Sequence, residues 1–191
     1  MNKRIYVTLA IVAALSQLQG CYTAPAGSAA SGAGSLDRRT AGAVIGDEEI
    51  EGRAKKRMRD TFPIKIADNI SPTSYNRQLL LTGQVPDEAT RVRAGEVVKG
   101  IPDMRTVFNE LTVGPAASLA SGAGDATTTS QVKARMIRDE RVPGSHIKVV
   151  TESGVVYLMG LLTRAEAKLA TEIARTTSGV ARVVILFEYL D

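Results

Sequence analysis

The chain has few of the residues that build disulfide-linked cores or catalytic centres. Its 191 residues include no tryptophan, one cysteine (Cys21), one histidine (His146), three phenylalanines and five tyrosines. A single cysteine excludes a disulfide within the chain, so we expect stability to come from packed aliphatic cores. A lone histidine excludes the usual kind of metal site and leaves no recognisable nucleophile–base pair. We therefore predict no catalytic residue, no metal site and no cofactor.

The acidic and glycine clusters also favour a protein that is not an enzyme. The acids of residues 47–49 suit the positive end of a helix dipole, and we expect Asp47 to cap that helix. Asp139 and Glu140 are expected in a solvated loop. Gly32 and Gly34 follow no predicted strand, which excludes a phosphate-binding loop.

The N-terminus has the order of an export signal. Lys3 and Arg4 precede an apolar run, residues 5–18, that is too short to span a bilayer as a helix. The run ends in Leu-Gln-Gly-Cys, with Cys21 last, and this resembles a bacterial lipobox. The resemblance implies cleavage after Gly20 and acyl chains of the palmitate type on Cys21. The alternative is an ordinary signal peptide with a chance cysteine.

The lipobox implies a location as well as an anchor. More than one acyl chain gives stable anchoring, at about 0.8 kcal/mol for each buried CH₂. Enteric-type sorting retains lipoproteins with aspartate after the cysteine in the inner membrane, and this chain has Tyr22 there. The resemblance therefore implies a lipid-anchored protein of the outer membrane that faces the periplasm.

Charge excludes nucleic acid as a partner. The whole chain has a formal charge of +4, but Lys3 and Arg4 leave with the predicted signal peptide, so the mature charge is +2. Residues 47–113 contain eleven charges of each sign, and residues 125–191 contain nine basic and eight acidic residues. Neither segment has the concentrated basic excess that nucleic-acid binding requires.

Two segments lack the large apolar side chains that an ordered core requires. Residues 21–46, rich in alanine, glycine, serine and threonine, are predicted to be a flexible, lipidated tether. Residues 114–124 have a similar composition and are predicted to be an interdomain linker. Together with a signal peptide at 1–20, these segments leave two candidate domains, residues 47–113 and 125–191.

The two candidate domains repeat each other. At an offset of 77 residues Gly83 falls on Gly160, and residues 105–107 fall on residues 182–184. A repeat of this length indicates a duplicated domain. Both glycines are expected where the chain leaves a strand. The pattern predicts helix, strand, turn, strand, helix and strand in each copy: 48–60, 64–70, 75–77, 78–85, 87–98 and 106–113, then 128–138, 147–151, 152–154, 155–162, 164–176 and 182–190.

These residues resemble the BON domain. The resemblance rests on the apolar strand that ends near glycine, the helix started by Pro86 or Thr163, and the turns at residues 100–103 and 178–180. The predicted fold class is α+β: two tandem BON-type domains, each α-β-β-α-β with a three-stranded mixed sheet covered on one face by two helices. The whole chain is similar to dual BON-domain outer-membrane lipoproteins.

The resemblance implies a role in envelope integrity and a second domain that binds anionic phospholipid of the phosphatidylglycerol type. Its first helix would carry the site. Residues 127–129 are threonines where the family can have an aromatic residue, so insertion should be shallow. The expected lipid-binding residues are Thr128, Lys133, Arg135, Met136, Arg138 and Arg141.

Two alternatives remain open at this stage. The basic side chains are a solvated helix face in the simpler interpretation. The protein is otherwise a scaffold or adaptor for envelope or division proteins, which predicts an exposed strand edge or an apolar patch. Lipid binding predicts instead that the bases converge beside exposed apolar groups such as Met136 or Ile137.

Overall fold

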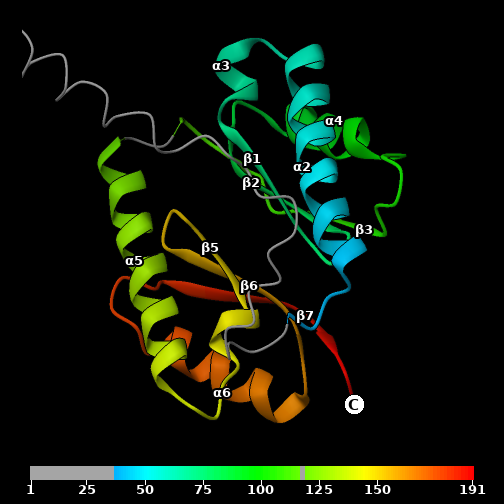
Figure 1. Cartoon of the computed structure of the whole chain (residues 1–191). Helices are drawn as coiled ribbons and strands as arrows, with labels where there is room; N and C mark the ends of the chain where they lie inside the picture. The colour runs from blue at the N-terminus through cyan, green and yellow to red at the C-terminus, as the bar shows by residue number, and fades with distance from the viewer. Residues whose placement is uncertain (1–36, 117–118) are drawn as a thin grey trace, which may run out of the picture. The chain divides into compact units, whose positions relative to one another are not determined.

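The computed structural model describes residues 37–116 and 119–191, which form two successive α/β units (Figure 1). The predicted signal peptide and Cys21 lie outside these residues. The first unit contains α2 (Ala41–Thr61), α3 (Ile64–Ala67), β1 (Ile70–Tyr75), β2 (Gln78–Val85), α4 (Glu88–Val98), β3 (Thr106–Asn109) and β4 (Thr112–Val113). The second contains α5 (Leu119–Arg138), the 3₁₀ turn η2 (Gly144–His146), β5 (Lys148–Glu152), β6 (Val155–Leu162), α6 (Arg164–Arg175) and β7 (Arg182–Tyr189).

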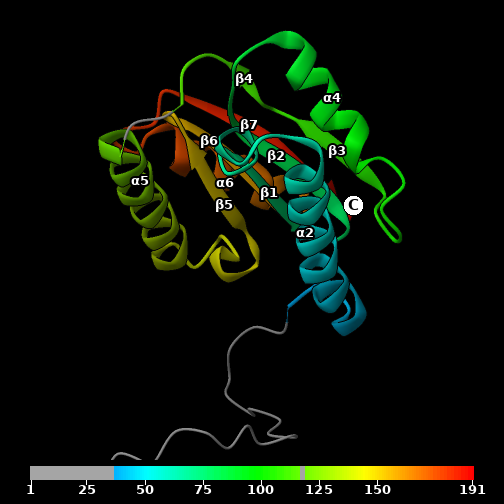
Figure 2. The ribbon, with the colours of Figure 1, turned by 90° about the horizontal axis from the view of Figure 1, so that it is seen from above.

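Both sheets are mixed, which confirms the predicted α+β class. β2 pairs with β1 antiparallel and with β3 and β4 parallel, and β6 pairs with β5 antiparallel and with β7 parallel. The helices of each unit pack on its own sheet, and α5 runs beside β5 (Figure 2). No helix in the two described ranges has the length and apolar character needed to cross a bilayer.

Two-residue turns fix the register of both hairpins. Asn76 and Arg77 have φ of 50° and 66°, and Ser153 and Gly154 have φ of 50° and 75°. Positive φ at both turn residues is the type I′ geometry that matches strand twist. The first strand must therefore continue to Tyr75, so the strand predicted at 64–70 is wrong: residues 64–67 are helical and the strand begins at Ile70.

The first helix of each unit begins earlier than predicted. α2 starts at Ala41, where the Thr40 hydroxyl accepts a hydrogen bond from the amide of Ala43, and α5 starts at Leu119. The prediction that Asp47 caps the first helix is wrong, since Asp47 lies inside it. Residues 41–46 and 119–124, whose composition suggested tether and linker, are helical.

The second helices start where the sequence indicates. α6 has a full capping box, in which the Thr163 hydroxyl and the Glu166 carboxylate each accept from the other's backbone amide. α4 is capped by Asp87, directly after Pro86. The two repeat glycines lie inside β2 and β6, not at strand exits. At Gly83, with φ of 121°, a Cβ would lie 1.8 Å from the Asn69 carbonyl oxygen.

Each sheet is buried on both faces. One face of each packs against its own helices, in two aliphatic clusters that contain Leu79 and Leu81 in the first unit and Leu158 in the second. The opposite faces share a third cluster formed by Tyr75, Leu80, Tyr157, Met159 and Leu186. This sheet-to-sheet contact explains why β2 and β6 are apolar at consecutive positions, where a half-exposed strand would alternate.

Candidate functional site

Arginines gather where the end of α5 meets α6. An open hollow of about 540 Å³ is lined by Arg135, Arg138, Asp139, Glu140, Arg141 and Ile173. A smaller, mostly apolar hollow beside it also contains Arg135 and Arg138. Ile137, 60% exposed, lies on the same turn of α5. Three predicted residues, Arg135, Arg138 and Arg141, are therefore brought together.

Three other predicted lipid-binding residues have structural roles. Met136 is fully buried in the core of the second unit. Thr128 is 7% exposed and lies under Gly179, whose Cβ would come within 2.6 Å of the Thr128 hydroxyl oxygen. The Lys133 ammonium donates to the carbonyl oxygens of Gly144 (2.6 Å) and Ile147 (2.5 Å), and burial lowers its pKa.

Arg135 is also a structural residue, and the first unit shows why. It donates to the Ile173 carbonyl oxygen and to two threonine hydroxyls at the end of α6. At an offset of 78 residues Arg57 of α2 donates to the carbonyl oxygens of residues 97, 99 and 100, at the end of α4. Both copies therefore use an arginine to satisfy the last carbonyls of the second helix.

Arg138 and Arg141 are specific to the second unit. At the same offset their counterparts are Asp60 and Pro63. Arg141 pairs with Asp139 at 2.7 Å, and this hydrogen bond lowers the pKa of Asp139 to about 2. Arg138 is exposed and has no hydrogen-bond or ion-pair partner among the described residues. It is the basic group of the hollow that is free to bind a ligand.

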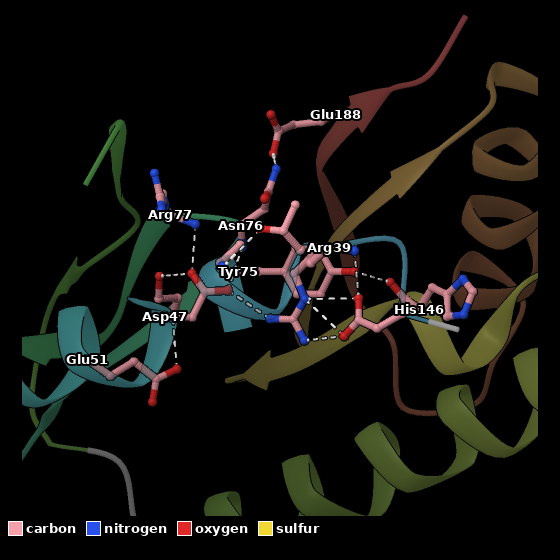
Figure 3. A network of polar contacts seen from close by, with 12 residues as sticks. Arg39, Asp47, Glu51, Tyr75, Asn76, Arg77, His146 and Glu188 are labelled. Atoms are coloured by element: carbon pink, nitrogen blue, oxygen red, sulfur yellow. Dashed lines mark hydrogen bonds and ion pairs between the residues drawn. The ribbon is translucent and has the colours of Figure 1, made fainter. Parts of the chain in front are cut away.

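A second polar site, shown in Figure 3, holds the hairpin turn of the first unit. The buried Asp47 carboxylate accepts from the amides of Asn76 (2.7 Å) and Arg77 (2.6 Å) and from the Ser74 hydroxyl (2.7 Å). Arg39 forms an ion pair with it at 2.8 Å. This role of Asp47 was not predicted from the sequence, although both copies have an aspartate at this position of the first helix. Its counterpart Asp125 accepts from the amides of the second hairpin turn.

Polar contacts extend from this hairpin to the second unit. The Tyr75 hydroxyl donates to the His146 carbonyl oxygen at 2.7 Å (Figure 3), and burial raises the pKa of Tyr75 to about 12. The Asn76 side chain donates to Glu188, which also pairs with Arg105. His146 is thus a buried residue at a contact between the units. No group of three metal-ligating side chains occurs in residues 37–116 and 119–191.

Comparison with known proteins identifies the family. The BON domain model matches residues 46–115 and 124–191. Outer membrane lipoprotein DolP of Haemophilus influenzae is 39% identical over 175 residues, which covers 91% of each chain. Osmotically-inducible protein Y of Escherichia coli is 34% identical, covering 74% of this chain and 72% of that protein. A 21 kDa hemolysin of Actinobacillus pleuropneumoniae is 29% identical, covering 82% and 80%. The chain belongs to the BON family, as an outer-membrane lipoprotein with two BON domains.

Proposed function

We propose that the second BON domain binds anionic phospholipid head groups at the end of α5 and thereby supports the integrity of the outer membrane. The observation that carries the proposal is Arg138, an exposed guanidinium that lines an open hollow and has no partner among the described residues. A guanidinium can donate two parallel hydrogen bonds to a phosphate. The acyl anchor expected on Cys21 would keep this surface close to lipid.

The electrostatic attraction is local and modest. Three arginines of the hollow are offset by Asp139 and Glu140, which leaves a formal charge of +1. A basic residue near an anionic membrane surface contributes about 1 kcal/mol, and its field decays within a Debye length of about 8 Å. We therefore expect weak binding that falls steeply with salt and depends on the anchor for a high local lipid concentration.

The apolar part of the surface is small. Ile137 is exposed beside the arginines, whereas Met136 points into the core. Burying one isoleucine side chain contributes about 2 kcal/mol. Without an aromatic residue on this turn, contact should be confined to the head-group region, as the threonines at residues 127–129 already predict.

Co-sedimentation with liposomes tests the proposal. The mature chain with Cys21→Ser, which cannot be acylated, would be mixed with phosphatidylcholine liposomes with and without phosphatidylglycerol, at low and physiological salt. We expect binding only to the anionic liposomes, and a loss of several-fold in Arg138→Glu. Lys65→Glu, which reverses an exposed charge in the first domain, is the matched control and should bind normally.

Two results would contradict this proposal. One is equal binding to neutral and anionic liposomes, and the other is equal loss in Arg138→Glu and the Lys65→Glu control. Cells that produce Arg138→Glu in place of the natural protein should admit a large antibiotic that an intact outer membrane excludes. Lys133 is unsuitable for this test because its substitution would remove two hydrogen bonds that hold α5 in place.

A further inference from the structure

β7 has an open edge of full strand length. It pairs only with β6 among the described strands. The amide of Leu190 donates to the carbonyl oxygen of Leu162 in β6. Because amides alternate in direction along a strand, those of the even-numbered residues of β7 face β6. Those of Val183, Ile185, Phe187 and Tyr189 point away from it. Such a row of unpaired amides and carbonyls is a template for another strand.

The other strand edges are covered or interrupted. On β1, Pro72 lacks an amide hydrogen and the Glu51 carboxylate accepts from the Ser74 amide. The other edge of the first sheet is formed by β3 and β4, and it is interrupted between them at residues 110 and 111. α5 packs along β5, where the Thr129 hydroxyl donates to that of Thr151. β7 has none of these protections.

In the first unit, a side chain fills the space between the second helix and the corresponding edge strand. Asn109 pairs with Leu81, and Ile185 pairs with Leu158, the counterpart of Leu81. Asn109 and Ile185 therefore occupy equivalent positions in the two units. Asn109 donates from its side chain to the Arg91 carbonyl oxygen of α4. It also lies so close to Gly95 that a Cβ there would approach within 2.9 Å. Helix and edge strand are thus tied together in the first unit.

In the second unit the same space is an open groove. The counterparts of Arg91 and Gly95 are Lys168 and Glu172, and these line a groove of about 320 Å³ between α6 and β7. Ile185, 46% exposed, and Tyr189, 45% exposed, form its apolar floor.

The groove also has an uncompensated positive charge. Arg164 and Lys168 line it, and neither side chain has an acidic partner among the described residues. Glu172 pairs with Arg175, and the Asp191 carboxylate accepts from the backbone amide of Arg164. A ligand that fits this site is apolar at alternate positions and acidic near Arg164 and Lys168.

We propose that an extended, acidic protein segment docks here as an added strand on β7, with alternate apolar side chains in the groove. Main-chain hydrogen bonds to the outward amides would provide affinity, and the groove would provide specificity. None of the residues that line this groove lines the arginine hollow. The peptide site and the lipid surface can therefore be tested separately.

Fluorescence anisotropy tests the proposal with a short fluorescein-labelled peptide in which valine and glutamate occupy alternate positions, on the same face of the strand, with serine between them. The protein is the mature chain with Cys21→Ser. Ile185→Pro removes one outward amide without removing a bond to β6, and should weaken binding about tenfold. Arg164→Glu with Lys168→Glu should weaken it at least as much, and Lys65→Glu should leave it unchanged.

Altered peptides and a second protein variant test the charge and the main-chain hydrogen bonds separately. Replacing glutamate by lysine in the peptide should abolish binding, as should methylating alternate backbone amides. Thermal unfolding would verify that Ile185→Pro is folded, and Ile185→Asn, which introduces the first unit's residue, is the second variant. The proposal is overturned if the peptide does not bind at about 1 mM protein or binds all variants equally. It is also overturned if sedimentation shows a dimer that Ile185→Pro disperses, since the edge would then pair with a second copy.

Discussion

Replacing Asp47 by alanine should destabilise the protein far more than replacing its counterpart, Asp125. The Asp47 carboxylate is 4% exposed and accepts three hydrogen bonds of 2.6–2.7 Å in addition to its ion pair with Arg39. Asp125 is half-buried and accepts two, at 2.7 and 2.9 Å, without an ion-pair partner. Both hold a hairpin turn, so the two substitutions differ mainly in burial and charge pairing.

The expected loss in the free energy of unfolding depends on which groups each substitution leaves without a hydrogen-bond or ion-pair partner. Asp47→Ala leaves two turn amides and a buried hydroxyl without an acceptor and Arg39 without its buried partner, at a cost of about 3–5 kcal/mol. Asp125→Ala leaves two amides within reach of water, at a cost of about 1–2 kcal/mol. For a chain of this length 1 kcal/mol shifts the melting temperature by roughly 2–4 °C, so Asp47→Ala should lower it by about 10 °C.

Urea unfolding followed by far-ultraviolet circular dichroism would measure both free energies of unfolding on the mature Cys21→Ser chain. Unchanged slopes with denaturant would verify that the compared states are the same. If the two aspartate variants differ by less than about 0.5 kcal/mol, burial and charge pairing do not set the strength of these turn contacts, and the reasoning is wrong.

Three further predictions use the same assay. Gly83→Ala should cost more than about 3 kcal/mol because of positive φ and a backbone clash, whereas Gly160→Ala, whose Cβ would be 3.2 Å from its nearest atom, should cost less. The hydrogen bond from Arg38 lowers the pKa of Glu166 to about 2. The stabilisation that ionised Glu166 provides is therefore complete above its ordinary pKa of 4.5 and is lost as the pH falls toward 2. In Glu166→Gln the free energy of unfolding should depend less on pH over that range. Tyr75→Phe removes a hydrogen bond between the units and should cost about 1 kcal/mol.

The sequence predicted what depends on local chemistry and periodicity. β2 and β6 match their predicted limits, 78–85 and 155–162, because an apolar run between turn residues is a strong strand signal. The duplicated order of elements also followed from the repeat. The helix starts at Ala41 and Leu119 were missed because small residues are compatible with both a flexible segment and a helix, and tertiary packing decides between them.

The candidate site was predicted in outline but not residue by residue. A helix face is known only when its neighbours are known, so the sequence alone placed Met136 and Lys133 on the surface. Comparing the first helices of the two copies at an offset of 78 residues would have separated the roles. Met136 and Arg135 repeat Met58 and Arg57, which marks them as structural, whereas Arg138 replaces an aspartate.

The two copies share a buried core but differ in the residues they expose for binding. The shared cluster that includes Leu80 and Met159 buries one face of both sheets, so neither copy has a free sheet face to offer a partner. In the first copy the Asn109 side chain fills the space between the edge strand and the second helix, and Asp60 stands where the second copy has Arg138. Among the described residues, the second copy alone combines an open strand edge at Ile185 with Arg138, an arginine that has no hydrogen-bond or ion-pair partner there. Surface substitutions there should therefore change binding with little change in stability, whereas substitutions in the first copy's buried network should act mainly through stability.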